Sequence, residues 1–424
     1  MRPRLLVILV FVLLNRALVA QSTAQEPSES VPSVQSLLER IQRLEKRINE
    51  LEDHERQNAQ AQPDISASQV TSEKTPAEAG SMTMSSSSED MHSNPAVREA
   101  EVHYPSLQIR GFADVDFSAT DANETNSGFN LGQLVLHLAS PLSSKVSYFG
   151  EISFTAQPDT YGVSVERSII RFDYNDYFKM SFGKYHTPIG YWNTAFHHGA
   201  WLQTTITRPE SVKFGGTLIP VHFVGLQTEG NIPSGDFGLS YSVGVGNGRW
   251  SILNKAGDDG DANSNRAWVV RVNAQPSKLY GLQLGGSVYR DLLTPTGGAI
   301  RREWIENAYV TWTKRRPEVL AEFTNVRHGD IQTDQVWNSQ AYYVQMAYRL
   351  PWQENKWKPY FRFEHIHRPK SEPDWDVDDF VQSTLGIRYD ITTYAAFKGE
   401  YRNTRRGVGE PSVNGAFFQT AFTF

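Results

Sequence analysis

The side chains best suited to chemistry are basic residues that recur at even spacing in alternating segments. Arg167 and Arg171 lie on one face of such a segment, and Arg388, Lys398 and Arg402 fall in two segments that follow each other closely. Basic side chains grouped around a water-filled space attract anions. Salt-bridged residues that merely fill a wet interior would give the same pattern, so both interpretations remain open.

Histidines and hydroxyls give weaker signals for catalysis or metal binding. His186, His197 and His198 share one long segment, and His365 and His367 flank a single position, but neither group has a third ligand at a predictable spacing. No nucleophile-elbow motif nominates a Ser, His and acid set. The acidic segments DDGDAN and EPDWDVDD could bind Ca²⁺, although solvated acidic loops are commoner. We predict no enzyme activity, no cofactor and no resident metal.

Composition excludes several classes of protein. The chain has 424 residues, a net charge of -6, a mean hydropathy of -0.46 and no cysteine. Disulfides, cysteine-based zinc sites and a lipidated cysteine are therefore excluded. The mild negative charge gives no electrostatic footprint for nucleic acid.

The N-terminus predicts export from the cytoplasm. Arg2 and Arg4 precede an apolar run that is too short to span a bilayer as a helix, and small residues follow at Ala20 and Ala24. This is the layout of a secretory signal peptide, assigned to residues 1–24, with cleavage after Ala20 or Ala24.

Residues 31–56 predict a short coiled-coil helix. Apolar residues alternate at spacings of three and four along one seam. The seam residues favour two strands by the general rule, whereas RIQRLE and RINELE resemble an Arg-x-x-x-x-Glu trimerisation pattern, so we expect a trimer. A single amphipathic helix is the alternative. Residues 57–104 then read as a flexible linker. The seam consists of Val34, Leu37, Ile41, Leu44, Ile48 and Leu51.

From residue 105 to residue 424 the pattern changes to strict alternation. Segments such as LQIRGFADVDF and KVSYFGEISF place apolar residues on one face and polar residues on the other. Short and long polar connections take turns between them, and the long ones include residues 187–220. We predict an all-β, sixteen-stranded antiparallel transmembrane β-barrel, because only a closed sheet satisfies its backbone hydrogen bonds in lipid. A soluble sandwich would fill the second face with core residues instead.

The phase of alternation assigns side chains to the two faces. Glu166, Lys184, Glu306 and His365 are expected on the lipid face near the long-loop ends of strands, where a charge costs about 0 to 1 kcal/mol. Basic and acidic residues are nearly balanced on the inner face, which predicts no net field for anions. The inner set is Arg110, Arg167, Arg171, Lys179, Arg271, Arg349, Arg362, Arg388, Lys398 and Arg402 with Asp114, Asp116, Glu151, Asp173, Glu229, Glu322, Glu364, Asp390 and Glu400.

The chain ends in GAFFQTAFTF, an alternating aromatic strand. Phe418, Phe422 and Phe424 share one face, and Phe424 is expected in an interfacial aromatic girdle. A terminal Phe on such a strand resembles the signal read by the machinery that inserts outer-membrane barrels. An edge strand of a soluble sheet is the alternative, but its exposed aromatics would promote aggregation.

The long connection at residues 187–220 is unusually aromatic. It contains Tyr191, Trp192 and Trp201 and is the third long connection. With GKYHTPIGYWNTAFHHGAWLQT, the N-terminal coil and the terminal Phe, the sequence resembles the phosphate-selective porin O and P family over roughly residues 105–424. That resemblance implies a channel narrowed by a loop folded into its lumen. The candidate pore-lining residues are Arg167, Arg171, Tyr191, Trp192, His197, His198, Trp201, Arg208, Arg271, Arg388, Lys398 and Arg402.

The resemblance also implies location, partners and selectivity. We expect a passive porin of the outer membrane that contacts lipid and lipopolysaccharide. We also expect a homotrimer whose coiled coil lies in the periplasm and points toward the cell wall. Anion or phosphate preference is implied by the family, but the scarcity of inner lysines departs from its pattern. The alternative is a structural anchor between membrane and cell wall, which would carry no current.

Overall fold

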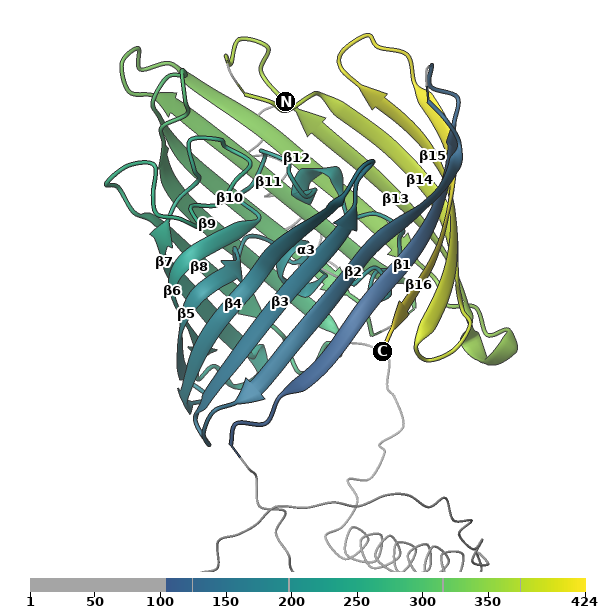
Figure 1. Ribbon diagram of the computed structural model, residues 1–424, viewed down its shortest axis with the longest axis horizontal. Coiled ribbons are helices and arrows are strands. Elements are labelled where there is room, and N and C mark those ends of the chain that lie inside the picture. Colours follow the sequence, from purple (N-terminus) through teal and green to yellow (C-terminus); the bar gives the residue numbers. More distant parts are fainter. Residues whose placement is uncertain (1–103, 124, 197–198, 315, 374) are drawn as a thin grey trace, which may run out of the picture. The chain divides into compact units, whose positions relative to one another are not determined.

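Sixteen antiparallel strands close into a barrel in the computed structural model, which describes residues 104–123, 125–196, 199–314, 316–373 and 375–424. Each strand pairs with its sequence neighbours, and β1 pairs with β16 to close the ring (Figure 1). The predicted sixteen-stranded barrel is confirmed. The strands are β1 (Gln108–Thr120), β2 (Gly128–Pro141), β3 (Val146–Ala156), β4 (Tyr161–Asn175), β5 (Phe178–His186), β6 (His222–Asn231), β7 (Leu239–Asn247), β8 (Ala267–Ala274), β9 (Leu282–Leu293), β10 (Arg301–Trp312), β11 (Glu318–Asp330), β12 (Val336–Ala347), β13 (Trp357–His367), β14 (Phe380–Asp390), β15 (Ala395–Arg406) and β16 (Val413–Thr423).

The chain divides into two units, residues 1–93 and 94–424. The first lies wholly outside the described residues, and with it the predicted signal peptide and coiled coil. All of the predicted linker except Tyr104 also lies outside them. Among the described residues, no helix is long and apolar enough to cross a membrane.

Burial alternates along the strands as the sequence pattern predicts. In β10 the odd-numbered residues are buried or nearly so, whereas Arg302, Trp304 and Glu306 on the other face are exposed. The outer surface of the barrel carries many exposed apolar side chains, among them Phe129, Phe182, Val245, Tyr342 and Leu385. A closed sheet with an apolar outer band meets both requirements of a spanning barrel, since its backbone is paired and its outer face matches hydrocarbon.

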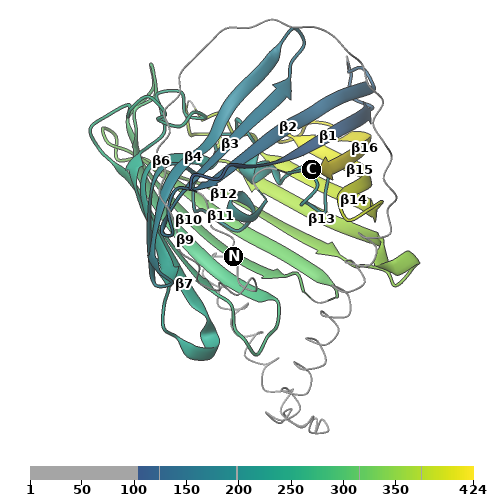
Figure 2. The ribbon, with the colours of Figure 1, turned by 60° about the horizontal axis from the view of Figure 1, so that its bottom comes forward.

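The connections at one end are mostly tight turns, such as residues 176–177 and 391–394, and those at the other end include the long loops. We call residues 187–221 L3, residues 248–266 L4 and residues 368–379 L7, of which residue 374 is not described. L3 contains α3 (Trp192–Ala195) and η1 (Glu210–Val212), and the short-turn end carries η2 (Gly235–Phe237) and η3 (Gln353–Asn355). Figure 1 labels α3 within the ring of strands, and Figure 2 gives a second view of that ring.

Two of the predicted outward residues need correction. A β-bulge in β4 places Glu151 opposite Arg167 but Ile152 opposite Val165, so Glu166 is the extra residue. The bulge turns Glu166 inward, where Ser153 Oγ donates to its carboxylate at 2.7 Å and the residue is 6% exposed. Glu306 does face outward, but it lies halfway along β10 rather than near the end.

The last strand closes the barrel at the short-turn end. The backbone groups of Phe424 and Gly111 exchange two hydrogen bonds, of 2.9 and 3.1 Å. Phe418 and Phe422 are exposed on the outer face. Other exposed aromatics at this end complete an interfacial girdle: Trp312, Tyr348, Trp352, Tyr394 and Phe424.

Candidate functional site

The first anchor of L3 inside the barrel is Glu322, an inward residue of β11. Its carboxylate accepts hydrogen bonds from the backbone N–H groups of Tyr191 (3.0 Å) and Trp192 (2.7 Å), and from the hydroxyl of Tyr343 (2.5 Å). Gly190 makes this approach feasible because its φ is +72° and a Cβ would lie 2.1 Å from Glu322 Oε2. The carboxylate therefore satisfies the orphan donors at the start of α3.

Aromatic packing fixes the same segment. Trp192 is fully buried and meets the Tyr343 ring edge to face at 5.9 Å, with Phe196 at 5.1 Å. The Arg362 guanidinium lies 5.7 Å from the Trp192 ring. The aromatic character that marks this connection in the sequence therefore reflects packing inside the barrel.

Two cations of the wall hold the middle of L3 through its carbonyls. Arg388 Nη1 donates to the carbonyls of Trp201 and Gln203, both at 2.7 Å. Lys398 is fully buried, and its Nζ donates to the carbonyls of Ala200 and Thr205. Both are pore-lining candidates of the sequence analysis, and both direct their donors at the loop.

Arg362 of β13 repeats this arrangement. Its Nη1 donates to Thr205 Oγ1 at 2.9 Å and to the Thr207 carbonyl at 2.8 Å, while its Nε pairs with Glu364 at 2.8 Å. The residue is fully buried. A buried guanidinium needs this many partners because an unpaired one is costly.

Carboxylates of the wall hold the second half of L3 by its N–H groups. Glu400 of β15 accepts a 2.7 Å hydrogen bond from the Ile206 N–H, and Glu364 accepts one of 2.7 Å from the Glu210 N–H. Wall groups of both signs thus bind the backbone of L3 between Tyr191 and Glu210. The loop is a fixed part of the lumen.

Glu210 in η1 carries an electrostatic latch. Its carboxylate receives both terminal nitrogens of Arg406, at 2.7 and 3.0 Å, and an ion pair from Lys213. Burial opposes ionisation of Glu210, yet hydrogen bonds from Arg406 and Lys213 outweigh it and hold its pKa below the ordinary 4.5. The latch is therefore complete at neutral pH.

Three other predicted pore-lining arginines are neutralised by neighbouring carboxylates. These pairs are Arg167 with Glu151, Arg171 with Asp173 and Arg402 with Glu400. Arg171 also lies 3.3 Å from Glu229. Their charges are largely balanced within the wall, so each contributes little attraction for a passing ion.

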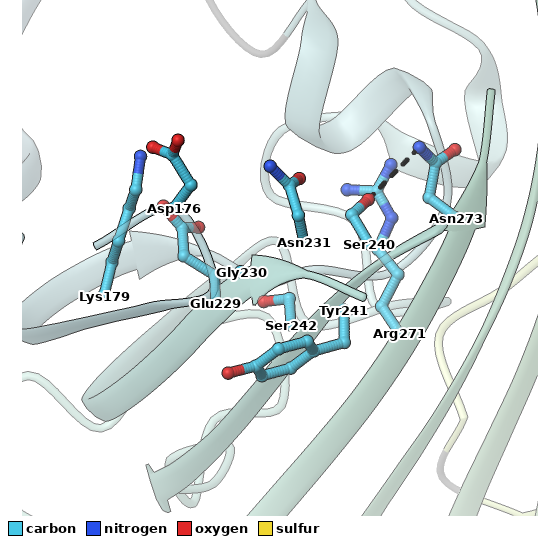
Figure 3. Close-up of a pocket in the computed structure, with 10 residues that line it drawn as sticks. All are labelled: Asp176, Lys179, Glu229, Gly230, Asn231, Ser240, Tyr241, Ser242, Arg271 and Asn273. Carbon is cyan, nitrogen blue, oxygen red and sulfur yellow. Dashed lines mark hydrogen bonds between the residues drawn. The ribbon is translucent and has the colours of Figure 1, made fainter. Parts of the chain in front are cut away.

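A polar cavity of about 270 Å³ lies between β5 and β8 toward the short-turn end (Figure 3). Arg271 borders it, donating to Tyr309 OH at 2.7 Å and to Thr194 Oγ1 of L3 at 3.0 Å. Among the described residues, neither Arg271 nor Lys179 lies within ion-pair distance of a carboxylate, although Asp176 and Glu229 also line the cavity. In the strand pairing Lys179 lies opposite Asp173 and Glu229, whereas Arg271 lies opposite Ser242 and Ser287. Arg271 is therefore a cation of this cavity with no carboxylate directly opposite it in the sheet.

The remaining predicted residues of L3 are placed as follows. Arg208 Nη2 donates to Asn193 Oδ1 at 3.3 Å, and its guanidinium covers the Phe214 ring at 3.9 Å. Trp201 contributes its carbonyl to Arg388. His197 and His198 lie outside the described residues. No group of three or more His, Asp or Glu side chains in the described part of the chain could hold a metal ion.

L4 and L7 narrow the long-loop end. Arg249 of L4 pairs with Glu303 of β10 at 2.8 Å, and Trp375 of L7 meets His328 of β11 edge to face at 4.3 Å. His328 also binds Glu372 of L7. These are contacts between loops and the inner wall, and the alternation pattern cannot predict which residues make them.

Sequence reasoning placed Glu322, Glu364 and Arg362 on the inner face but gave them no role. Their role depends on contacts with a loop more than a hundred residues away in sequence, such as that between Glu322 and Trp192. The sequence places them on the inner face, but no local residue pattern shows which of them contacts the loop.

No family model matches the chain, and its sequence matches no curated protein. Solved structures share its fold. The anion-selective porin from Comamonas acidovorans superposes with a TM-score of 0.57 at 9% identity, over 76% of this chain and 100% of that one. The outer membrane channel DcaP of Acinetobacter baumannii gives 0.53 at 13% identity, over 76% and 97%. The trimer form of in-vitro folded OmpT, an outer membrane protein of Vibrio cholerae, gives 0.51 at 13%, over 76% and 99%. The chain therefore has the fold of outer-membrane porins.

Proposed function

We propose that the chain is an outer-membrane porin, a passive diffusion channel for small hydrophilic solutes. The observation that carries this proposal is the docking of L3 against the inner wall through Glu322, Arg388 and Lys398. A loop held this way narrows the lumen and leaves the closed sheet intact. The likeness to porins in fold supports it.

Transport in this proposal needs no chemical step. A solute moves down its gradient, L3 sets the size limit, and wall charges bias the choice between ions. The protein supplies a hydrated path across hydrocarbon. An enzyme activity is not part of the proposal, because the charged residues of the site serve packing and docking.

Anion preference is the finer part of the proposal. Arg271 and Lys179 lie beside the cavity below L3 without a paired carboxylate among the described residues, whereas Arg167, Arg171 and Arg402 are paired. Arg271 lies opposite two serines in the sheet, and Lys179 lies opposite Asp173 and Glu229 without an ion pair among the described residues. Cations that are not held in an ion pair raise the local concentration of anions, phosphate among them. The preference is expected to be modest because Asp176 and Glu229 line the same cavity.

Planar-bilayer recording tests the channel itself. Purified protein should give discrete current steps, which the alternative of a structural anchor would not give. In a KCl gradient the reversal potential should have the sign of anion selectivity. Added phosphate should reduce the current by competing for the same cations.

A charge-removal pair tests the selectivity. Substituting Arg271→Gln and Lys179→Gln together should move the reversal potential toward zero or to the cation-selective sign. Lys278→Gln is a matched control, since Lys278 is an exposed cation at the short-turn end, paired with Asp236 at 2.9 Å. If the reversal potential shifted equally in the double variant and in Lys278→Gln, the cavity would not be the source of the selectivity.

The homotrimer and the N-terminal parts belong to the same proposal. Trimers are expected from the coiled-coil seam, and the trimer form of the Vibrio cholerae protein is consistent with such an assembly. The coil would then lie in the periplasm, near the cell wall. The C-terminal Phe418, Phe422 and Phe424 are proposed as the signal for the barrel-insertion machinery. Cross-linking of the intact protein in membranes would test the trimer.

A further inference from the structure

A row of alternating aromatic and cationic side chains crosses the outer face of the barrel from β8 to β12. Trp268 opposes Arg290, Arg290 opposes Trp304, and Trp304 opposes Arg327, with Asn338 next in line. The Trp268 and Trp304 rings meet edge to face at 5.5 Å. All are on the outward phase, which makes the row part of the outer surface.

The row lies near the long-loop end at a constant depth. Arg290, Trp304 and Arg327 are each three residues from the end of their strands at Leu293, Arg301 and Asp330. Three residues span about 10 Å along a strand, hence about 7 Å in depth at the usual tilt. This is where the apolar band of a barrel gives way to polar headgroups.

The cations of this surface have no internal partner of opposite charge. Arg302, on the same face as Trp304, and Arg327 are exposed and form no ion pair or hydrogen bond through their side chains within the described ranges. Arg290 donates only to Asn265 Oδ1, at 3.1 Å. Glu306 lies one row deeper and pairs with none of them, which leaves an excess of positive charge. On β2 and β4 the outward residues near this end include the apolar Phe129, Leu131 and Val163.

We propose that Arg290, Arg302 and Arg327, which surround Trp304 and lie beside Trp268, bind a phosphate-bearing lipid headgroup of the outer leaflet. Guanidinium groups match phosphate with two parallel hydrogen bonds, and indole rings prefer the same interfacial depth. Arg290 and Arg327 are two strands apart, about 10 Å between backbones. That separation suits a headgroup with two phosphates, as in diphosphorylated lipid A. Indole rings favour the membrane interface, so this surface suits a phosphate carried by a lipid better than free phosphate in water.

The proposal rests on the proposed membrane location but not on conduction. Native mass spectrometry of the detergent-purified protein, titrated with diphosphorylated lipid A, measures the binding directly. The substitutions R290Q, R302Q and R327Q together should weaken binding by at least about tenfold, since each cation near an anionic surface contributes measurably. Single-channel conductance of this variant should equal that of the wild type, because the three side chains face away from the lumen.

Two further variants keep the result interpretable. R290K, R302K and R327K together preserve charge but not the paired guanidinium hydrogen bonds. This variant should restore part of the binding, which a barrel damaged by the substitutions would not do. R316Q, K278Q and K356Q remove three cations from the opposite end and should bind like the wild type. The proposal fails if the glutamine variant keeps wild-type affinity, if the opposite-end variant loses as much, or if dephosphorylated lipid A binds equally well.

Discussion

Removing the Glu322 carboxylate should release the start of L3 from the wall. Glu322→Ala leaves the N–H groups of Tyr191 and Trp192 without their acceptor in a largely buried site. Each buried donor left unsatisfied costs about 1–3 kcal/mol. The two together shift the balance between docked and undocked L3 by about 2–6 kcal/mol, which is roughly 30-fold to more than 10,000-fold.

A thiol at Val212 would report this shift. Val212 lies in η1 and is 5% exposed, and the chain has no cysteine, so Val212→Cys gives a single buried site for maleimide. When opening is fast relative to reaction, the labelling rate follows the undocked population. The rate should therefore rise at least about 30-fold in the Glu322→Ala background.

A control on the same strand separates loop release from general damage. Glu318 of β11 pairs with Lys358 at 3.0 Å rather than with L3, so Glu318→Ala should leave the labelling rate unchanged. The anchoring role is refuted if Glu322→Ala labels no faster than its parent while the barrel stays folded. The same conclusion would follow if both alanine variants gave equal rates.

Three further predictions concern the ends of L3 and of the chain. Gly190→Ala should undock L3 as Glu322→Ala does, because the new Cβ would lie 2.1 Å from Glu322 Oε2 and φ is +72°, and raised open-channel noise would show it. The Glu210 latch should weaken only below pH 4.5, because the pKa of Glu210 is lowered in the folded state and the stability from that shift is lost as the pH falls through the folded-state pKa. An Arg406→Gln variant should have lost most of this acid dependence. An unchanged acid response in that variant would contradict the latch. Phe424→Ser should lower the amount of assembled barrel in membranes while folding into detergent in vitro is retained, and equal assembly in cells would exclude Phe424 from the insertion signal.

The fold could be predicted because lipid and water impose a period of two on every strand. β10 follows that period without exception, and its sequence alone assigns the inner and outer faces. The assignment failed at Glu166, because a bulge inserts one residue and inverts the phase beyond it. No local residue pattern marks this bulge, so only the paired strand reveals it.

The site was harder to predict than the wall. The aromatic content of residues 187–220 pointed to a loop with a packing role, and Trp192 is indeed fully buried. The partners of that loop come from strands β11 to β15, and their identity depends on how the ring closes. Arg388 and Lys398 have the same alternating pattern as Arg271. Only the tertiary contacts separate the two that bind carbonyls of L3 from Arg271, which donates to the hydroxyls of Thr194 and Tyr309.

Positive charge inside the barrel is divided between two tasks, and this division limits what a count of residues can say about selectivity. A guanidinium that donates to loop carbonyls, such as that of Arg388 or Arg362, stabilises the constriction. The carbonyl dipoles that it contacts partly cancel its electrostatic field. A guanidinium held only by hydroxyls, such as Arg271, keeps its charge available to mobile ions. The nearly balanced inner charges predicted from sequence therefore do not imply a neutral pathway. Under the proposed function, the preference depends on which cations lack a carboxylate or a carbonyl partner beside the open space. Among the described residues these cations include Arg271, which is held by the hydroxyls of Thr194 and Tyr309.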